Sequence, residues 1–159
     1  MTRLLTACIL TFLVSCTVSP STQTSVGQVS SASTGAATAF TSEINSFRAS
    51  QGRGPLQPNA ALTRAATAHA LDMARRGYFS HASVGGPNGD NFRARARAGG
   101  CAMRSGAENI ATGQRSEAAV FTAWENSAGH RRNMLVRSYT QYGLGRSGNI
   151  WVLKLAAQC

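Results

Sequence analysis

The chain has 159 residues, of which 43% are hydrophobic and 14% are charged, and its formal net charge at pH 7 is +10. This length fits one domain and is too short for two full domains or for a TIM barrel. The charged fraction lies well below the roughly 25% of typical soluble domains, which argues against a highly charged cytosolic protein and against disorder of the whole chain. No apolar run reaches the roughly 18 residues that a membrane-spanning helix needs.

The N-terminus has the pattern of an export signal. Arg3 precedes an apolar stretch that ends at Val14, and small residues follow it. This order is typical of a secretory signal peptide, here residues 1–15. The run Leu13-Val14-Ser15-Cys16 resembles a bacterial lipobox, in which the cysteine is acylated and becomes the first mature residue. We therefore expect a lipoprotein facing the periplasm from the outer membrane; an ordinary signal peptide, and secretion, is the alternative.

The segment after the expected lipidation site resembles a linker. Between Thr17 and Thr38, 11 of 22 residues are serine or threonine and none is charged. Such a segment buries too little apolar surface to offset the entropy of ordering it. We interpret residues 16–38 as the acylated cysteine and a flexible tether, and we place the functional domain at residues 39–159.

The cysteines predict one disulfide. Cys8 leaves with the signal peptide and Cys16 carries lipid, so Cys101 and Cys159 remain. Exported proteins meet an oxidising compartment, in which two remaining cysteines pair. A metal-binding or catalytic thiol is the alternative, although the last residue of a chain is a poor place for a nucleophile.

The patterning predicts an α+β domain. Apolar residues at helical spacing indicate a helix that stops at Gly52, a second between Asn59 and Gly77, and another that follows Ser116 through Trp124. A short helix is expected from Asp90 to Gly99. Asn59 and Ser116 are good N-caps, and Gly77 after two arginines marks a helix end. Residues 141–146 and 150–155 read as two strands joined by a turn.

Few residues can carry chemistry, because the chain has three histidines and six acids. His69 lies on the apolar face of the second helix, where a buried structural histidine is the favoured interpretation. His81, Glu108 and His130 lie in glycine-rich segments. None of them forms a local metal motif or a nucleophile elbow, so spacing alone does not predict that they converge.

The order of these segments resembles the CAP superfamily, which comprises cysteine-rich secretory proteins, insect antigen 5, plant pathogenesis-related proteins and bacterial relatives. The resemblance covers about 120 residues. The segments that carry it are Ile44-Asn45-Ser46-Phe47-Arg48, Leu62-Thr63-Arg64-Ala65-Ala66 with His69 and Met73, Gly77-Tyr78-Phe79-Ser80-His81, Gly106-Ala107-Glu108-Asn109-Ile110-Ala111, Trp124 through Asn133, Gly143-Leu144-Gly145 and Ile150-Trp151-Val152.

The resemblance implies a three-layer α-β-α sandwich with a small antiparallel sheet. It also implies a cleft with two histidines and two acids, which binds zinc in some members. His81, Glu108 and His130 match three of these positions, and Asn109 neighbours them in the motif. The fourth position, an acid in the animal and plant branch, is Ser127 here. Glu125 lies about 200° around the helix from Ser127 and does not replace it.

Three functions follow as hypotheses. The first is a non-catalytic envelope module whose cleft binds a lipid, a sterol-like molecule or a wall component. The second is a zinc-dependent hydrolase with the metal on His81 and His130 and with Glu108 as general base. The third is a structural or protein-interaction module. A two-histidine site predicts weak zinc binding, and the alternative is a hydrogen-bonded scaffold. We expect a monomer and, because of export, no nucleic-acid partner.

Overall fold

The computed structural model describes the backbone of residues 30–159 and the side chains of residues 39–159. The helices are α1 (Ser30–Ser50), α2 (Ala60–Arg76), α3 (Phe92–Ala98), α4 (Glu117–Glu125) and α5 (Ala128–Met134). The strands are β1 (Gln57–Pro58), β2 (Gly106–Thr112), β3 (Gln141–Ser147) and β4 (Ile150–Ala156). The expected signal peptide at residues 1–15 and the expected acylation at Cys16 lie outside the described residues.

The described strands form one sheet in the order β1-β3-β4-β2. β3 and β4 form the predicted hairpin, and β2 pairs antiparallel with the other side of β4. The short β1 pairs parallel with β3. The sheet is therefore mixed, whereas a wholly antiparallel sheet was expected. β2 is therefore an edge strand, and one of its sides is open to residues from outside the sheet.

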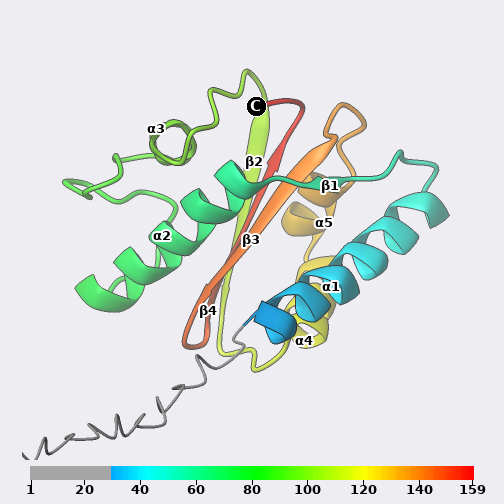
Figure 1. Cartoon of the computed structure of the whole chain (residues 1–159), viewed down its shortest axis with the longest axis horizontal. Coiled ribbons are helices and arrows are strands. Elements are labelled where there is room, and N and C mark those ends of the chain that lie inside the picture. The colour runs from blue at the N-terminus through cyan, green and yellow to red at the C-terminus, as the bar shows by residue number, and fades with distance from the viewer. Residues whose placement is uncertain (1–29) are drawn as a thin grey trace, which may run out of the picture.

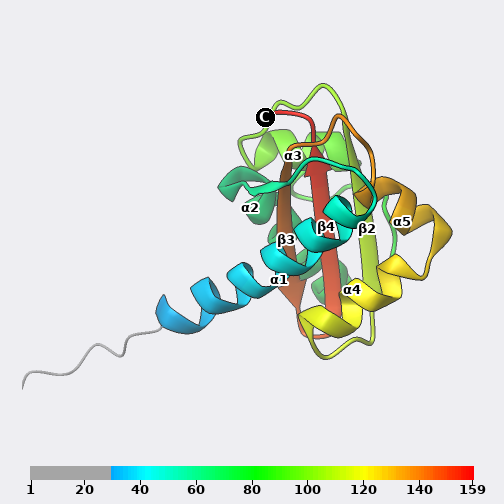
Figure 2. The same ribbon diagram turned by 90° about the vertical axis from the view of Figure 1, so that its right-hand side faces the viewer.

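Helices cover both faces of the sheet, which confirms the α-β-α sandwich. Figures 1 and 2 show α2 and α3 on one face and α1, α4 and α5 on the other. The larger core cluster joins α1 and α4 to the sheet through residues such as Phe40, Trp124 and Leu153. A smaller cluster joins α2 to the opposite face through Ala66, Met73 and Val152. Alternate residues of each strand thus face different helical layers.

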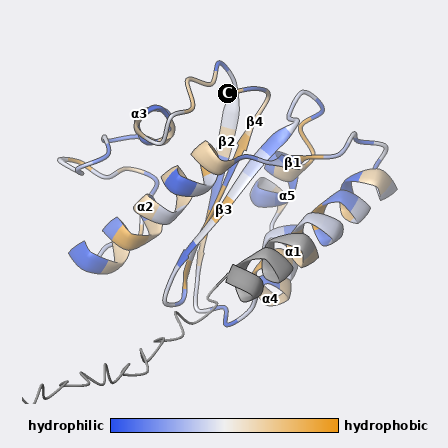
Figure 3. Ribbon diagram, viewed as in Figure 1, coloured by the Kyte–Doolittle hydropathy of each residue, from blue (hydrophilic) through white to orange (hydrophobic). Residues whose placement is uncertain are grey.

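Helix α2 has the caps that the sequence predicts. The Asn59 side chain accepts hydrogen bonds from the backbone N–H groups of Ala61 and Leu62, and Gly77 adopts a left-handed conformation with φ 67°. Figure 3 shows hydrophilic and hydrophobic bands alternating along α2. Its apolar side lies on β3, where Gly143 and Gly145 leave room for the helix backbone. This packing brings the buried side of α2 directly over the sheet.

Helix α1 begins earlier than the domain boundary predicted at Ala39. It starts at Ser30 and therefore extends into the segment assigned to the tether. Alanines in this segment, such as Ala36 and Ala37, favour helix. Once the turn containing Phe40 and Ile44 is anchored in the core, adding residues to an existing helix costs little.

Three elements were not predicted from the sequence: β1, β2 and α5. The glycine-rich segment that contains Glu108 was assigned no element from the sequence, and it forms strand β2. The segment that contains His130 forms the short helix α5. Both elements depend on partners that are distant in sequence, and local periodicity does not reveal such partners.

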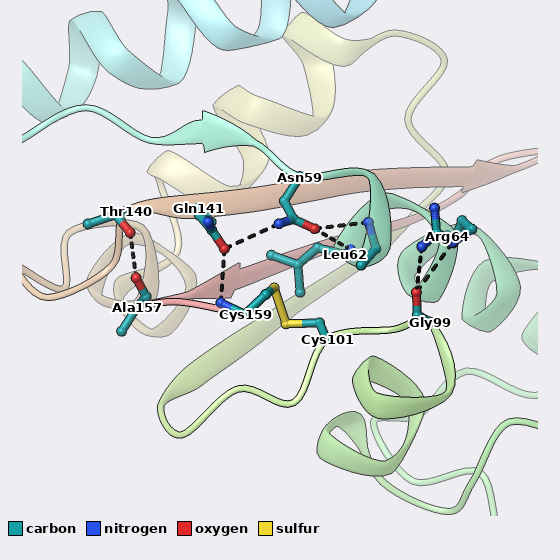
Figure 4. The surroundings of a disulfide bond; sticks show 10 residues. Asn59, Leu62, Arg64, Gly99, Cys101, Thr140, Gln141, Ala157 and Cys159 are labelled. Carbon is teal, nitrogen blue, oxygen red and sulfur yellow. Dashed lines mark hydrogen bonds between the residues drawn. A yellow bond between two sulfur atoms is a disulfide. The ribbon is translucent and has the colours of Figure 1, made fainter.

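The predicted disulfide is present. It joins Cys101, which precedes β2, to Cys159 at the end of the described chain. Figure 4 shows Gln141 of β3 beside it, accepting hydrogen bonds from the Cys159 backbone at 3.1 Å and from the Asn59 amide at 3.3 Å. The disulfide therefore ties the segment that enters β2 to the segment that leaves β4. Among the described helices, none has the length and apolar character that crossing a bilayer requires.

Candidate functional site

The site is centred on Glu108 of the edge strand β2. The strand alternation turns Glu108 toward the α2 and α3 layer, together with Ile110, which packs on α2. Asn109 points the other way and contacts α5. The residue opposite Glu108 on the neighbouring strand is Lys154 of β4. Cross-strand partners of this kind have adjacent side chains, so the sheet itself brings the two charges together.

The Glu108 carboxylate accepts hydrogen bonds from three side chains. Lys154 Nζ lies 2.5 Å from Oε2, and Arg95 Nη2 lies 3.0 Å from Oε1 and 3.3 Å from Oε2. His81 Nδ1 lies 2.9 Å from Oε1. The Glu108 side chain is only 2% exposed, and the side chains of Lys154 and Arg95 are equally inaccessible. Each carboxylate oxygen therefore has two donors, which occupy the lone pairs of the group.

This environment holds Glu108 as a carboxylate. Burial alone would raise its pKa, but the hydrogen bond from His81 and the charges of Lys154 and Arg95 outweigh burial and lower the pKa to about 2. Burial lowers the pKa of Lys154, and the negative charge of Glu108 opposes that effect. Each buried charge thus depends on the other for its compensation.

Arg95 also fastens the loop that carries His81. Besides Glu108, Nη2 of Arg95 donates to the backbone carbonyl of His81 at 2.7 Å, and Nη1 donates to the Ser83 hydroxyl at 2.9 Å. The backbone of His81 is therefore held by Arg95 and its ring by Glu108. Arg95 comes from α3. From the sequence alone it was one of several scattered arginines and had no assigned role.

The hydrogen bond to Glu108 determines the tautomer of the neutral His81 ring. A carboxylate only accepts, so Nδ1 of His81 carries the proton of the neutral ring. Nε2 then has a free lone pair, and the side chain is 55% exposed. A carboxylate that orients an imidazole in this way is common both around metal ligands and around catalytic histidines.

His69 of α2 is buried, as predicted, and lies at the edge of the same cluster. Its Nε2 donates to the carbonyl of Ser80 at 3.1 Å and lies 3.8 Å from Oε1 of Glu108. Burial lowers the pKa of His69 to about 4, although Glu108 opposes this. His69 is therefore neutral near pH 7 and adds no charge to the cluster.

The other predicted cleft residues lie on the α5 side of β2. The Asn109 amide donates to the His130 carbonyl at 3.1 Å and accepts from the Asn133 amide at 2.9 Å, which anchors α5 on β2. Burial, and then the nearby His81, lower the pKa of His130, so the two imidazoles are electrostatic neighbours. Ser127 occupies the N-cap position of α5 without a capping hydrogen bond from its side chain.

A cavity of about 450 Å³ opens beside this cluster. Its wall consists of His81, Ala82, Asn91, Phe92, Ala107, Glu108 and Asn133. Of the five predicted cleft residues, His81 and Glu108 belong to this wall, whereas Asn109, Ser127 and His130 do not. The cavity wall thus combines apolar residues with polar ones, among them His81.

The ligand set that the family resemblance implies for zinc does not fit these residues. Ser127 supplies no carboxylate, and both oxygens of Glu108 are engaged by cations. Within residues 39–159, no group of three or more histidines, cysteines or acids is arranged to hold a metal ion. The remaining candidate metal ligands of the site are the imidazoles of His81 and His130.

Sequence reasoning missed Arg95 and Lys154. One signal for Lys154 was available, because it is the single lysine among 16 basic residues and sits between leucines in a predicted strand. A charge at such a position calls for a buried partner. Arg95 carried no comparable signal, because arginines flank it at two-residue intervals.

A three-layer sandwich with a histidine and glutamate cluster under α2 and α3 defines an SCP-like domain. The model of the cysteine-rich secretory protein family, CAP, matches residues 41–150, and the chain belongs to this family. The match spans the elements from α1 to the start of β4. The family resemblance noted in the sequence is thereby confirmed.

Two curated relatives come from Bacillus subtilis (strain 168). The uncharacterized protein YkwD is 38% identical over 109 residues, which is 67% of this chain and 41% of that protein. The uncharacterized membrane protein YlbC is 31% identical over 101 residues, which is 64% of this chain and 28% of that protein. The chain therefore matches less than half of the length of either relative.

Solved structures share the fold. An extracellular protein containing an SCP domain from Bacillus anthracis str. Ames superposes with a TM-score of 0.69 at 25% identity, over 75% of this chain and 39% of that chain. An outer surface protein from Borrelia burgdorferi gives a TM-score of 0.66 at 18% identity, over 79% of this chain and 94% of that chain. These likenesses support the α-β-α architecture.

Proposed function

We propose that this chain is an exported cell-envelope protein whose CAP domain binds a small ligand in the cavity beside His81 without transforming it. The observation that carries this proposal is the state of Glu108, whose oxygens are fully engaged by Lys154, Arg95 and His81. The cavity, by contrast, is open to a ligand. The cluster therefore serves to hold the cavity wall in one arrangement.

The state of Glu108 counts against the hydrolase hypothesis. A general base works best with a pKa near the operating pH, whereas the pKa of Glu108 is about 2. Its lone pairs are also occupied, so a water molecule would have to displace a charged partner. His81 and His130 are the groups left for a metal, and they supply only two ligands.

The cavity wall indicates the chemistry of the ligand. Ala82, Phe92 and Ala107 supply apolar surface, and the unpartnered Nε2 of His81 is able to accept a hydrogen bond from a ligand. The volume lies within the roughly 300–1,000 Å³ of small-molecule sites. We infer a ligand with an apolar part and a hydroxyl or amide donor, a description that fits a lipid, a sterol-like molecule or a wall component.

Export and anchoring complete the proposal. The N-terminal pattern with Cys16, the Cys101–Cys159 disulfide and the extracellular and outer-surface location of the structural neighbours support an exported protein. Acylation of Cys16 would hold the domain at the membrane. The intact mass of the protein extracted from membranes tests this directly, because an unmodified Cys16 leaves the mass of the bare chain.

Ligand capture tests the binding function. The purified protein is incubated with separate lipid and wall extracts, washed, and analysed for retained molecules by mass spectrometry. We expect retention by the native chain and loss in Phe92→Ser, which removes the apolar wall. Ala118→Ser, at an exposed position outside the cavity, is the matched control. No retained molecule, or equal retention by Phe92→Ser, contradicts the proposal and leaves a protein-interaction module as the remaining hypothesis.

A further inference from the structure

Lys154 is an unusual residue for this chain. It is the only lysine among 16 basic residues, and its side chain is fully buried. It lies on the central strand β4, between Gly143 of β3 and Glu108 of β2. In a chain that otherwise uses arginine, a single lysine at a buried position indicates that a compact ammonium group is required there.

The packing around Lys154 leaves room for a compact ammonium group. At Gly143, opposite Lys154, a Cβ atom would come within 2.2 Å of the α2 backbone at Leu62 and Thr63. The helix therefore lies close to the sheet beside Lys154, and Phe92 covers its ammonium group at 5.8 Å from the ring centroid. A branched, planar guanidinium would need more room than an ammonium group.

The charges in the cluster do not balance. Lys154 and Arg95 are two buried cations, and Glu108 is the one carboxylate that contacts them. His69 is neutral at pH 7 because burial lowers its pKa to about 4. The nearby acid of α2, Asp72, is occupied by Tyr78 and Arg76. The buried cluster thus carries one excess positive charge next to His81.

We propose that Lys154 is a specificity-determining residue of this cleft: with Arg95 it overcompensates Glu108, so that the cleft disfavours divalent cations at His81. In a poorly solvated site, one fixed positive charge opposes the entry of a doubly charged ion strongly. This inference rests on the proposed function, because it concerns which ligands the same cavity accepts. It also gives a reason why a CAP cleft can contain two histidines and still not hold a divalent metal ion.

Zinc titration of a charge variant tests the proposal. Lys154→Met keeps the length of the side chain and removes its charge, while Arg95 continues to pair with Glu108. We compare zinc binding by calorimetry at pH 7 in the native chain, in Lys154→Met and in Arg115→Met, which removes one exposed charge outside the cluster. We expect Lys154→Met to bind one zinc ion at least about 10-fold more tightly than the native chain. Arg115→Met should match the native chain.

A second variant shows whether the gain arises at this cleft. Adding His81→Ala to Lys154→Met should abolish the gain in zinc affinity. Equal zinc affinity in the native chain and in folded Lys154→Met overturns the proposal, and so does a gain that survives His81→Ala. Ligand capture by the native chain is independent of this comparison, so a failure of the binding function and a failure of the Lys154 inference are distinguishable.

The native chain gives a further test if Lys154→Met does not fold. Because the chain has one lysine, 15N labelling of lysine gives one side-chain amine signal. We expect an equimolar amount of zinc to leave this signal in place. A shift that saturates at one zinc ion per chain overturns the proposal, because it places the metal beside the buried ammonium group.

Discussion

At the scale of single residues, Glu108 is the counterion of two buried cations, and its removal leaves both without compensation. We expect Glu108→Gln to lower the free energy of unfolding by about 3–5 kcal/mol, the usual result of breaking a buried ion pair. Urea denaturation followed by circular dichroism measures this. Glu125→Gln is the control, because the Glu125–Arg131 pair at 3.7 Å is partly exposed at the surface, where an ion pair contributes less than about 1 kcal/mol. Similar losses in both variants would contradict the buried network.

His69 gives the molecule a specific sensitivity to acid. Its folded pKa of about 4 lies below the ordinary histidine value of 6.5, so the unfolded chain takes up this proton first as the pH falls. The free energy of unfolding therefore falls as the pH drops from 6.5 to 4, and the loss reaches about 3 kcal/mol at pH 4. We expect His69→Gln, which does not titrate, to remove this part of the pH dependence. Urea denaturation at a series of pH values provides the comparison, and an unchanged slope in His69→Gln would contradict a buried neutral His69.

At the scale of secondary structure, the contact between α2 and β3 positions one wall of the site. A Cβ atom at Gly145 would lie 2.2 Å from the Thr67 backbone nitrogen, so a methyl group there pushes the helix off the sheet. We expect Gly145→Ala to destabilise the fold by about 1–3 kcal/mol. Gly54→Ala is the matched control, since a methyl group at that position would meet no atom within 4 Å. Thermal unfolding of both variants decides the matter, and an equal melting temperature would contradict close packing.

Elements with local signals were predictable, whereas elements with distant partners were not. Helix α2 carries its own caps in Asn59 and Gly77, so its limits follow from the nearby sequence. Strand β2 lacks a clear alternation of apolar and polar residues, because Glu108 and Asn109 are both buried through polar partners on opposite faces. Their partners lie on α3, β4 and α5, which only the folded chain brings together.

At the scale of the whole molecule, the site was also predictable only where its residues lie in recognisable local segments. The family resemblance supplied His81, Glu108 and His130, because these residues lie in recognisable segments. It did not supply Lys154 and Arg95, whose role depends on the cross-strand register and on the packing of α3. Spacing along the chain contains no information on a pairing between residues 46 positions apart. The charge balance of the cleft therefore emerged only from the three-dimensional arrangement.

The disulfide acts on the stability of the whole domain. Cys101 and Cys159 are 58 positions apart, and closing a loop of this length stabilises the fold by about 4 kcal/mol in the chain-entropy model. We expect the Cys101→Ser/Cys159→Ser double variant to lose stability of this order in urea denaturation. Reduction of the native chain should give the same loss. A double variant as stable as the oxidised native chain would contradict this contribution.

The proposed function requires that Glu108 be a permanently charged, fully compensated group, which serves neither as a base nor as a metal ligand. A pH titration of its side-chain carboxyl carbon by 13C NMR tests this claim most directly. We expect the Glu108 signal to stay that of a carboxylate from pH 7 down to the acid limit of the folded state, since its pKa is about 2. A midpoint at or above the ordinary glutamate value of 4.5 would show that Lys154 and Arg95 do not compensate it, and would contradict the account.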